Sequence, residues 1–229
     1  MRISGPIFTL LIVALVLMSA GFACGDGNTG GNTSANTSNT NSGTKSSSTT
    51  TSSSTKTDIA GNYAATGSNP NGSAYKADLT ITPHDDVYQF TWTSGKNSYD
   101  GVGVMTDNRV AVSFTDGDSG KGCGVVLYKI NADGSLSGKK GYWGVNTMET
   151  ETAVRSKGSG SDLDGVYTMT GKNPSGENYS GTLTVIQSGD GYTFDWEAGN
   201  KFSGFGIRAG DYVAVGFGGQ KCSFVGYDV

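Results

Sequence analysis

Apolar and polar residues alternate along short stretches of this chain from residue 58 onward. Successive side chains of a β-strand point to opposite faces, so a period of two indicates a strand with one buried face. Gly, Asn and Asp, which favour tight turns, cluster between these stretches. The pattern predicts fourteen strands, at residues 61–67, 75–82, 87–93, 99–105, 109–115, 122–130, 135–142, 148–155, 165–171, 179–187, 191–197, 202–208, 212–217 and 221–228.

Two segments, 58–128 and 162–227, repeat one pattern in the same order. The spacing between equivalent residues is constant through Gly95 and Gly199 and then shifts by short gaps in predicted turns. A repeated pattern of this length indicates a repeated structural unit. The shared motifs are Gly-x-Tyr, Gly-x-Asn-Pro-x-Gly-x-x-Tyr, Leu-Thr, Tyr-x-Phe-x-Trp, Gly-x-Gly and Val-Ala-Val-x-Phe.

Strands that follow one another through short turns form an antiparallel meander. We therefore expect two tandem all-β domains, at 58–155 with about eight strands and at 162–229 with about six, joined by a linker at 156–161. Each domain is expected to close into a small barrel or to curl into a sheet, because open strand edges promote unwanted pairing.

The second copy has no counterpart of the predicted strands at 135–142 and 148–155. If eight strands close a barrel, this copy has open edges at 165–171 and 221–228, and an open edge is a template for strand pairing. The other domain, a second molecule or a ligand peptide would fill the gap. Alternatively, six strands suffice and the extra pair is peripheral.

An aromatic row recurs in both copies. Its ends are Tyr88 and Trp92 in the first copy and Tyr192 and Trp196 in the second, and each row lies on one face of its strand. These four residues are the candidate ligand-binding side chains if a barrel encloses a cavity. The favoured interpretation is core packing, because aromatic residues dominate small cores with or without a ligand.

The N-terminus has the organisation of a secretory signal peptide over residues 1–23. Arg2 supplies the positive charge, and residues 7–18 form an apolar run that is too short for a permanent membrane span. Small residues, Gly21 and Ala23, stand three and one positions before Cys24, whose position resembles that of the lipid-modified cysteine in bacterial lipoproteins. Ordinary cleavage after Ala23 is the alternative.

Residues 24–57 are expected to form a disordered tether. They consist mainly of Ser, Thr, Asn and Gly with almost no apolar side chain, so burial cannot offset the entropy of ordering. A lipid site directly before such a segment favours the role of holding the β-domains away from a membrane.

Charge and residue counts exclude several classes of function. The chain has 16 Lys and Arg against 20 Asp and Glu and no basic cluster, so nucleic acid is not an expected partner. His84 is the only histidine, which argues against a zinc site and a Ser-His-Asp site. The segment Asp116-Gly-Asp118-Ser-Gly120 is only part of a calcium-binding pattern, and a solvated turn is favoured. We expect no enzyme, no metal and no cofactor.

Cys123 and Cys222 hold equivalent positions, one in each copy. Neither copy can form an internal disulfide, and a bridge between the copies would require Cα atoms within about 7 Å of each other. The strand-like surroundings favour two buried cysteines that pack as small apolar residues.

As a set, the repeated motifs resemble those of small secreted bacterial all-β domains that are often labelled fibronectin-binding. The resemblance covers 58–155, including Asp133-Gly134-x-Leu136-x-Gly138 and Trp143, and covers 162–229 through its sixth strand. It implies an extracytoplasmic binding module and supplies no catalytic residues.

We therefore expect a non-enzymatic lipoprotein of the cell envelope, anchored by lipid in the outer membrane or at the cell surface, whose β-domains bind an extracellular protein. One alternative is a small-ligand carrier with an aromatic-lined cavity, which would need about 300 Å³ or more. Another is a purely structural envelope lipoprotein.

Lipidation at Cys24 is directly testable. Wild-type chain produced in bacteria should incorporate labelled palmitate, whereas Cys24→Ala should not, because the thiol that accepts the lipid is gone. Equal labelling of both chains would contradict lipidation at this residue.

Overall fold

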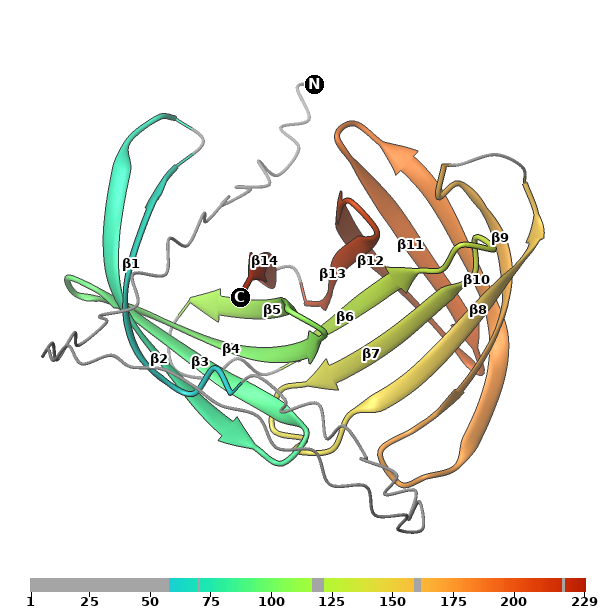
Figure 1. The fold of residues 1–229 in the computed structure, drawn as a ribbon, viewed down its shortest axis with the longest axis horizontal. Coiled ribbons are helices and arrows are strands. Elements are labelled where there is room, and N and C mark those ends of the chain that lie inside the picture. The colour runs from blue at the N-terminus through green and yellow to red at the C-terminus, as the bar shows by residue number, and fades with distance from the viewer. Residues whose placement is uncertain (1–57, 70, 117–121, 159–161, 220) are drawn as a thin grey trace, which may run out of the picture. The chain divides into compact units, whose positions relative to one another are not determined.

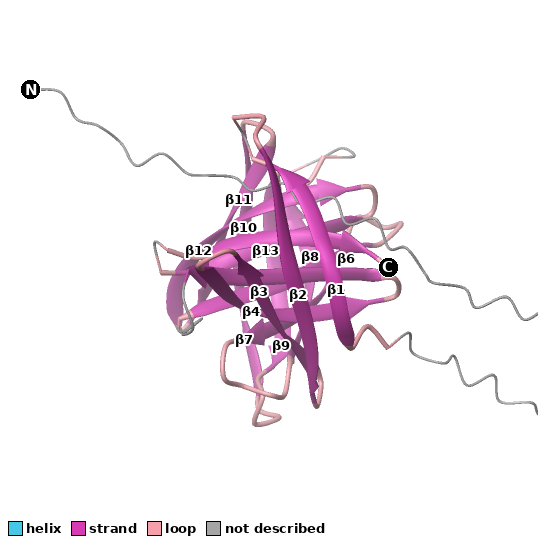
Figure 2. Ribbon diagram, turned by 90° about the vertical axis from the view of Figure 1, so that its left-hand side faces the viewer, coloured by secondary structure: helices cyan, strands magenta, loops and turns pink. Residues whose placement is uncertain are grey.

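The computed structural model describes residues 58–229 except 70, 117–121, 159–161 and 220. All regular structure in the described residues is β-strand (Figure 2). They contain no helix with the length and apolar character of a membrane span. The fourteen strands are β1 Gly61–Ser68, β2 Ala74–His84, β3 Val87–Ser94, β4 Asn97–Thr106, β5 Arg109–Asp116, β6 Cys123–Ile130, β7 Leu136–Tyr142, β8 Glu149–Lys157, β9 Gly165–Lys172, β10 Asn178–Ser188, β11 Gly191–Ala198, β12 Asn200–Ala209, β13 Tyr212–Gly218 and β14 Ser223–Asp228. Every predicted strand is present, with ends that agree within two residues.

The strands form two sheets. One is a six-stranded sheet in the order β1-β2-β3-β4-β5-β14, and the other is a closed eight-stranded barrel in the order β10-β11-β12-β13-β6-β7-β8-β9 (Figure 1). All neighbouring strands pair antiparallel. The prediction of an all-β fold with barrel closure is confirmed.

The two sheets do not coincide with the two sequence copies. Strands β6, β7 and β8 follow the first copy's β5 in sequence but complete the barrel of β9–β13, with β6 paired to β13. Strand β14 follows β13 but joins the first copy's sheet by pairing with β5 (Figure 1). The copies therefore exchange their sixth strands, and this differs from the expected arrangement in which each tandem domain keeps its own strands.

This exchange corrects one of the two open edges expected in the second copy. Strand β9 pairs with both β8 and β10, so the edge expected at 165–171 is closed by a strand from the first copy. The other expected edge, at 221–228, is present, but β14 forms it in the six-stranded sheet, where it pairs only with β5. The second edge of that sheet is β1, which pairs only with β2. The physical reason is that β6–β8 can close only one of the two sheets.

The two cores are built alike despite the exchange. In the barrel, the ring centroids of Phe194 and Trp196 lie 5.8 Å apart, and Tyr128 of β6 stacks on Phe194 at 5.7 Å. In the six-stranded sheet the equivalent Phe90 and Trp92 lie 5.5 Å apart. Tyr227 of β14, which corresponds to Tyr128, stacks on Phe90 at 6.2 Å. Each exchanged strand thus supplies a tyrosine that stacks on the phenylalanine of the sheet it joins.

The Gly-x-Gly motif makes room for these rings. A Cβ atom at Gly103 of β4 would lie 2.5 Å from the Phe90 ring, and one at Gly206 of β12 would lie 2.9 Å from the Phe194 ring. Both distances are shorter than a carbon–carbon contact allows. The glycines are therefore explained by close packing of the aromatic row on the neighbouring strand.

A third apolar cluster joins the outer face of the sheet to the outer face of the barrel. It contains Val102 and Val104 of β4, Val125 and Leu127 of β6, and Ala214 of β13. The Lys139 ammonium of β7 also donates a hydrogen bond of 2.9 Å to the Met105 carbonyl of β4. Strands β4, β5 and β6 are consequently buried on both faces, which explains their nearly continuous apolar sequences.

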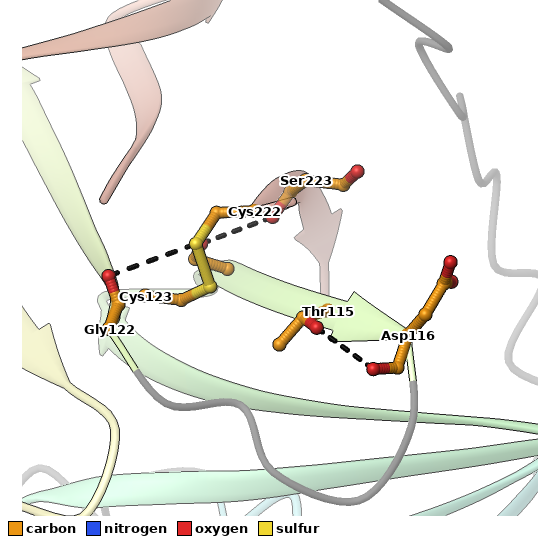
Figure 3. The surroundings of a disulfide bond; sticks show 7 residues. Thr115, Asp116, Gly122, Cys123, Cys222 and Ser223 are labelled. Carbon is orange, nitrogen blue, oxygen red and sulfur yellow. Dashed lines mark hydrogen bonds between the residues drawn. A yellow bond between two sulfur atoms is a disulfide. The ribbon is translucent and has the colours of Figure 1, made fainter. Parts of the chain in front are cut away.

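A disulfide joins Cys123 to Cys222, with Cα atoms 5.6 Å apart (Figure 3). The prediction of two independent buried cysteines is wrong. The exchange brings the start of β6 next to the residue preceding β14, because these are the points where the chain crosses between the sheets. The bond therefore ties the two crossings together.

Core packing of the two tryptophans can be tested by truncation. Trp196 is 1% exposed and Trp92 is 7% exposed. Trp196→Ala and Trp92→Ala should each lower the free energy of unfolding by about 3–5 kcal/mol, because each leaves a large cavity. Denaturant unfolding measures this, and a loss below about 1 kcal/mol at both sites would contradict the packing described.

Candidate functional site

Three charged side chains are buried inside the barrel: Lys140 of β7 and Glu149 and Glu151 of β8. Their place follows from strand alternation, because Leu136 and Gly138 precede Lys140 on the inward face of β7. Ala153 continues the inward face of β8 after the two glutamates. The cluster lies at the barrel end where β6 and β8 begin and β7 and β9 end.

Lys140 pairs with both carboxylates through a compact set of contacts. The Lys140 Nζ lies 3.1 Å from Glu151 Oε2 and 3.4 Å from Glu149 Oε2. The hydroxyl of Tyr179 donates to Glu151 Oε2 at 3.0 Å, and the hydroxyl of Tyr128 donates to Glu151 Oε1. Glu151 thus has a partner on each oxygen, as burial of a carboxylate requires.

Aromatic rings surround the ammonium group. Lys140 Nζ lies 5.5 Å from the ring centroid of Tyr179, 5.8 Å from that of Trp196 and 5.3 Å from that of Phe202. Such distances allow cation–π attraction. The indole of Trp196 also donates to the Tyr128 hydroxyl at 3.0 Å. The site is an aromatic and carboxylate cage that the protein's own lysine occupies.

The cage keeps its tyrosines protonated. Burial raises the pKa of Tyr128 well above its usual value, and the negative charge of Glu151 adds to this effect. Burial likewise raises the pKa of Tyr179, with further contributions from Glu151 and Glu149. The pKa of Tyr142 rises for the same reasons, burial first and Glu149 second. These hydroxyls therefore act as hydrogen-bond donors to the carboxylates across the physiological pH range.

Two open hollows adjoin this end of the barrel. One, of about 560 Å³, is lined by residues of β8, β9 and β10 that include Glu151 and Tyr179. The other, of about 590 Å³, includes Cys123, Tyr142 and Phe202. Beneath them the barrel interior is filled, since Tyr128, Tyr167, Phe194 and Trp196 are at most 1% exposed.

The six-stranded sheet contains the aromatic half of the same cage. Tyr75, Trp92, Tyr99 and Tyr227 correspond in sequence to Tyr179, Trp196, Phe202 and Tyr128. Among the described residues, the sheet has no strand equivalent to β7 or β8, and so no equivalent of Lys140, Glu149 or Glu151. The hydroxyls of Tyr75 and Tyr227 are buried, and neither donates a hydrogen bond to an acceptor among the described residues. The Trp92 indole N–H, which acts on the Tyr227 hydroxyl, is itself a donor.

Burial also raises the pKa of these two tyrosines. Desolvation is the cause for Tyr75 and the largest cause for Tyr227. The nearby Trp92 indole opposes part of the rise at Tyr227. Both groups are therefore neutral donors that face no acceptor in the described chain.

The candidate residues from sequence lie in two places. Trp92 and Tyr88 are buried in the core of the six-stranded sheet, Trp196 belongs to the barrel cage, and Tyr192 is partly buried against the barrel core. Ligand binding by these four residues stays a prediction. Sequence reasoning missed Lys140, Glu149 and Glu151. These three residues stand at the alternate positions of the predicted strands 135–142 and 148–155 that share a face with apolar residues. That alternation could have marked them as buried.

The remaining candidates give no site. His84 Nε2 lies 3.2 Å from Gln89 Oε1. Residues 117–120 of the Asp116–Gly120 segment, and Cys24, lie outside the described residues. Within the described part of the chain, no group of three or more His, Cys, Asp or Glu side chains is arranged to hold a metal ion.

Comparison with known proteins adds no identification: no protein-family model, no curated protein and no solved structure matches the chain.

The raised tyrosine pKa values predict loss of stability in alkali. The unfolded chain releases tyrosine protons from about pH 10, whereas the folded chain retains them, so the free energy of unfolding should fall above pH 10 by up to about 1.4 kcal/mol per pH unit for each such tyrosine. Below pH 10 this contribution is fully present.

Tyr142→Phe/Tyr179→Phe should make the alkaline decline shallower, because two of the responsible groups are removed. Denaturant unfolding at pH 8, 9, 10 and 11 measures the slope, with circular dichroism at pH 8 as the check on folding. An unchanged slope in the double variant would contradict the assignment.

Proposed function

We propose that the protein is a non-enzymatic, lipid-anchored binding module of the cell envelope that docks an extended segment of a partner protein at the edges of its six-stranded sheet. The observation that carries this proposal is the contrast between the two sheets. The barrel has no edge, whereas β1 and β14 each leave one side unpaired in the described chain. Unpaired strand edges bind extended peptides by adding a strand to the sheet.

The composition of the edges supports this use. Natural edge strands are usually protected by charged residues, proline or bulges. Strand β1 has the sequence GNYAATGS, without charge or proline, and its pairing with β2 is continuous over eight residues. Strand β14 has one charged residue, Asp228, which pairs with Arg109 near the end of the strand. Little along either edge would repel an incoming strand.

The filled barrel favours protein binding over small-ligand transport. A carrier barrel needs an interior cavity. Here Trp196, Phe194 and Tyr128 occupy the space that a ligand would take, and Lys140 fills the cage at the barrel end. The hollows at that end are open to solvent.

The N-terminal sequence supports the proposed location. A signal peptide, a lipid-modified Cys24 and a tether over 24–57 would hold the two sheets away from the outer membrane or cell surface, within reach of an extracellular protein. The resemblance to domains labelled fibronectin-binding supports an adhesive role of this kind.

Selection from a peptide library tests the docking site and does not require the partner to be identified. Random 25-residue peptides displayed on phage would be selected on immobilised residues 58–229, and the enriched peptides synthesised. They should slow amide hydrogen exchange in β1 and β14 of the protein while leaving β10 and β11, which are paired on both sides, unchanged. Enriched peptides that protect neither β1 nor β14, or an absence of enrichment, would contradict the proposed function.

A further inference from the structure

We propose that the partner segment is a two-stranded β-hairpin whose inward face carries a glutamate, and that this carboxylate accepts hydrogen bonds from Tyr75 and Tyr227. The inference rests on the proposed function and specifies the chemistry of the partner at the same site.

The barrel provides an internal template for the complex. There, β7 and β8 form a hairpin that fills the space between β6 and β9. In the six-stranded sheet, β14 corresponds to β6 and β1 corresponds to β9, and these are its two edges. The missing part is therefore one hairpin, paired to β14 on one side and to β1 on the other.

The unpartnered hydroxyls indicate what the hairpin must present. In the barrel, Tyr128 and Tyr179 both donate to Glu151 of the second hairpin strand. The hydroxyls of their equivalents Tyr227 and Tyr75 are buried in the six-stranded sheet without an acceptor among the described residues. A buried hydroxyl without a partner destabilises a protein by about 1–3 kcal/mol, so an incoming acceptor is favoured at this place.

Charge balance adds a second requirement. A buried carboxylate needs a cationic partner. In the barrel, Lys140 of the first hairpin strand supplies it and lies among Tyr179, Trp196 and Phe202. The sheet holds the corresponding rings of Tyr75, Trp92 and Tyr99 without a cation from any equivalent strand. A hairpin with an inward lysine in one strand and an inward glutamate in the other would place the ammonium among the rings and the carboxylate beside the two hydroxyls.

The chain offers a matched control for the unpartnered hydroxyls. Tyr75→Phe and Tyr227→Phe should leave the denaturant midpoint of the free protein unchanged or raise it, because each removes a buried donor without an acceptor. Tyr128→Phe and Tyr179→Phe should lower the midpoint, because each removes a donor to Glu151. A comparable loss at all four positions would overturn the assignment of Tyr75 and Tyr227 as vacant donors.

The chain's own hairpin serves as the binding probe. A synthetic peptide of residues 131–157 would be titrated into the protein of residues 58–229 and followed by calorimetry, with hydrogen exchange to locate it. We expect protection of β1 and β14. The peptide carrying Glu151→Gln should bind about tenfold more weakly, because hydrogen bonds to a charged carboxylate are stronger than hydrogen bonds to a neutral amide.

The protein variant Tyr75→Phe/Tyr227→Phe completes a double-mutant cycle with the Glu151→Gln peptide. With it, the two peptides should bind with affinities that differ by less than about twofold, since the donors that distinguish the carboxylate from the amide are absent. A tenfold difference that persists in this variant would overturn the proposal.

A fused hairpin tests the same proposal if the free peptide is unfolded and does not bind. A second copy of residues 131–157 appended after Val229 is held at high effective concentration beside the sheet. It should protect β1 from exchange, and less so when the appended copy carries the Glu151→Gln change.

No protection of β1 by the fused hairpin would overturn the proposal about the hairpin. The proposed docking of extended segments at the sheet edges would still be tested independently by the library selection. Protection that is equal for the glutamate and glutamine copies would reject the carboxylate requirement while leaving strand docking intact.

Discussion

The antiparallel pairing of β6 with β13 and of β14 with β5 is the constraint on which the rest of the structure depends. These two ladders place Val126 opposite Val215 and Val225 opposite Val112, so each sheet contains a strand from the other copy. The barrel closes because β6 brings β7 and β8 with it, whereas no further strand of the described residues pairs with β14 in the six-stranded sheet. Both the buried cage and the free edges follow from this distribution of strands between the barrel and the six-stranded sheet.

The disulfide and the shared apolar cluster hold the exchange in place. The bond between Cys123 and Cys222 closes a chain separation of 99 residues at the point where the strands cross. Bridges across long separations restrict the unfolded chain most strongly in the entropic account of disulfide stabilisation. The apolar contacts of Val104, Val125 and Ala214 then bury the outer faces of the crossing strands and of their neighbours.

The strands and the fold class could be predicted from the sequence because alternation and turn residues are local signals. The pairing partners of β6 and β14 could not, because Cys123-x-x-Val126-x-Tyr128 and Cys222-x-x-Val225-x-Tyr227 present the same inward pattern. Each strand therefore suits either sheet, and packing between the sheets, which no local pattern encodes, distinguishes them. The disulfide was missed for the same reason.

The candidate site was also only partly predictable. The aromatic half of the cage repeats in both copies and was visible as Tyr-x-Phe-x-Trp. Lys140, Glu149 and Glu151 occur in one copy, and charged residues in a strand usually face solvent. Barrel closure turns these side chains inward, and the exchange supplies Tyr179 of the second copy as a partner beside Tyr128.

Cross-strand nuclear Overhauser effects in residues 58–229 test the strand exchange most directly. The account predicts backbone contacts between Val126 and Val215 and between Val112 and Val225, because these residues stand opposite each other in the two ladders. Copies that kept their own strands would instead give contacts between Val112 and Val126 and between Val215 and Val225. Observation of this second set in place of the first would contradict the account.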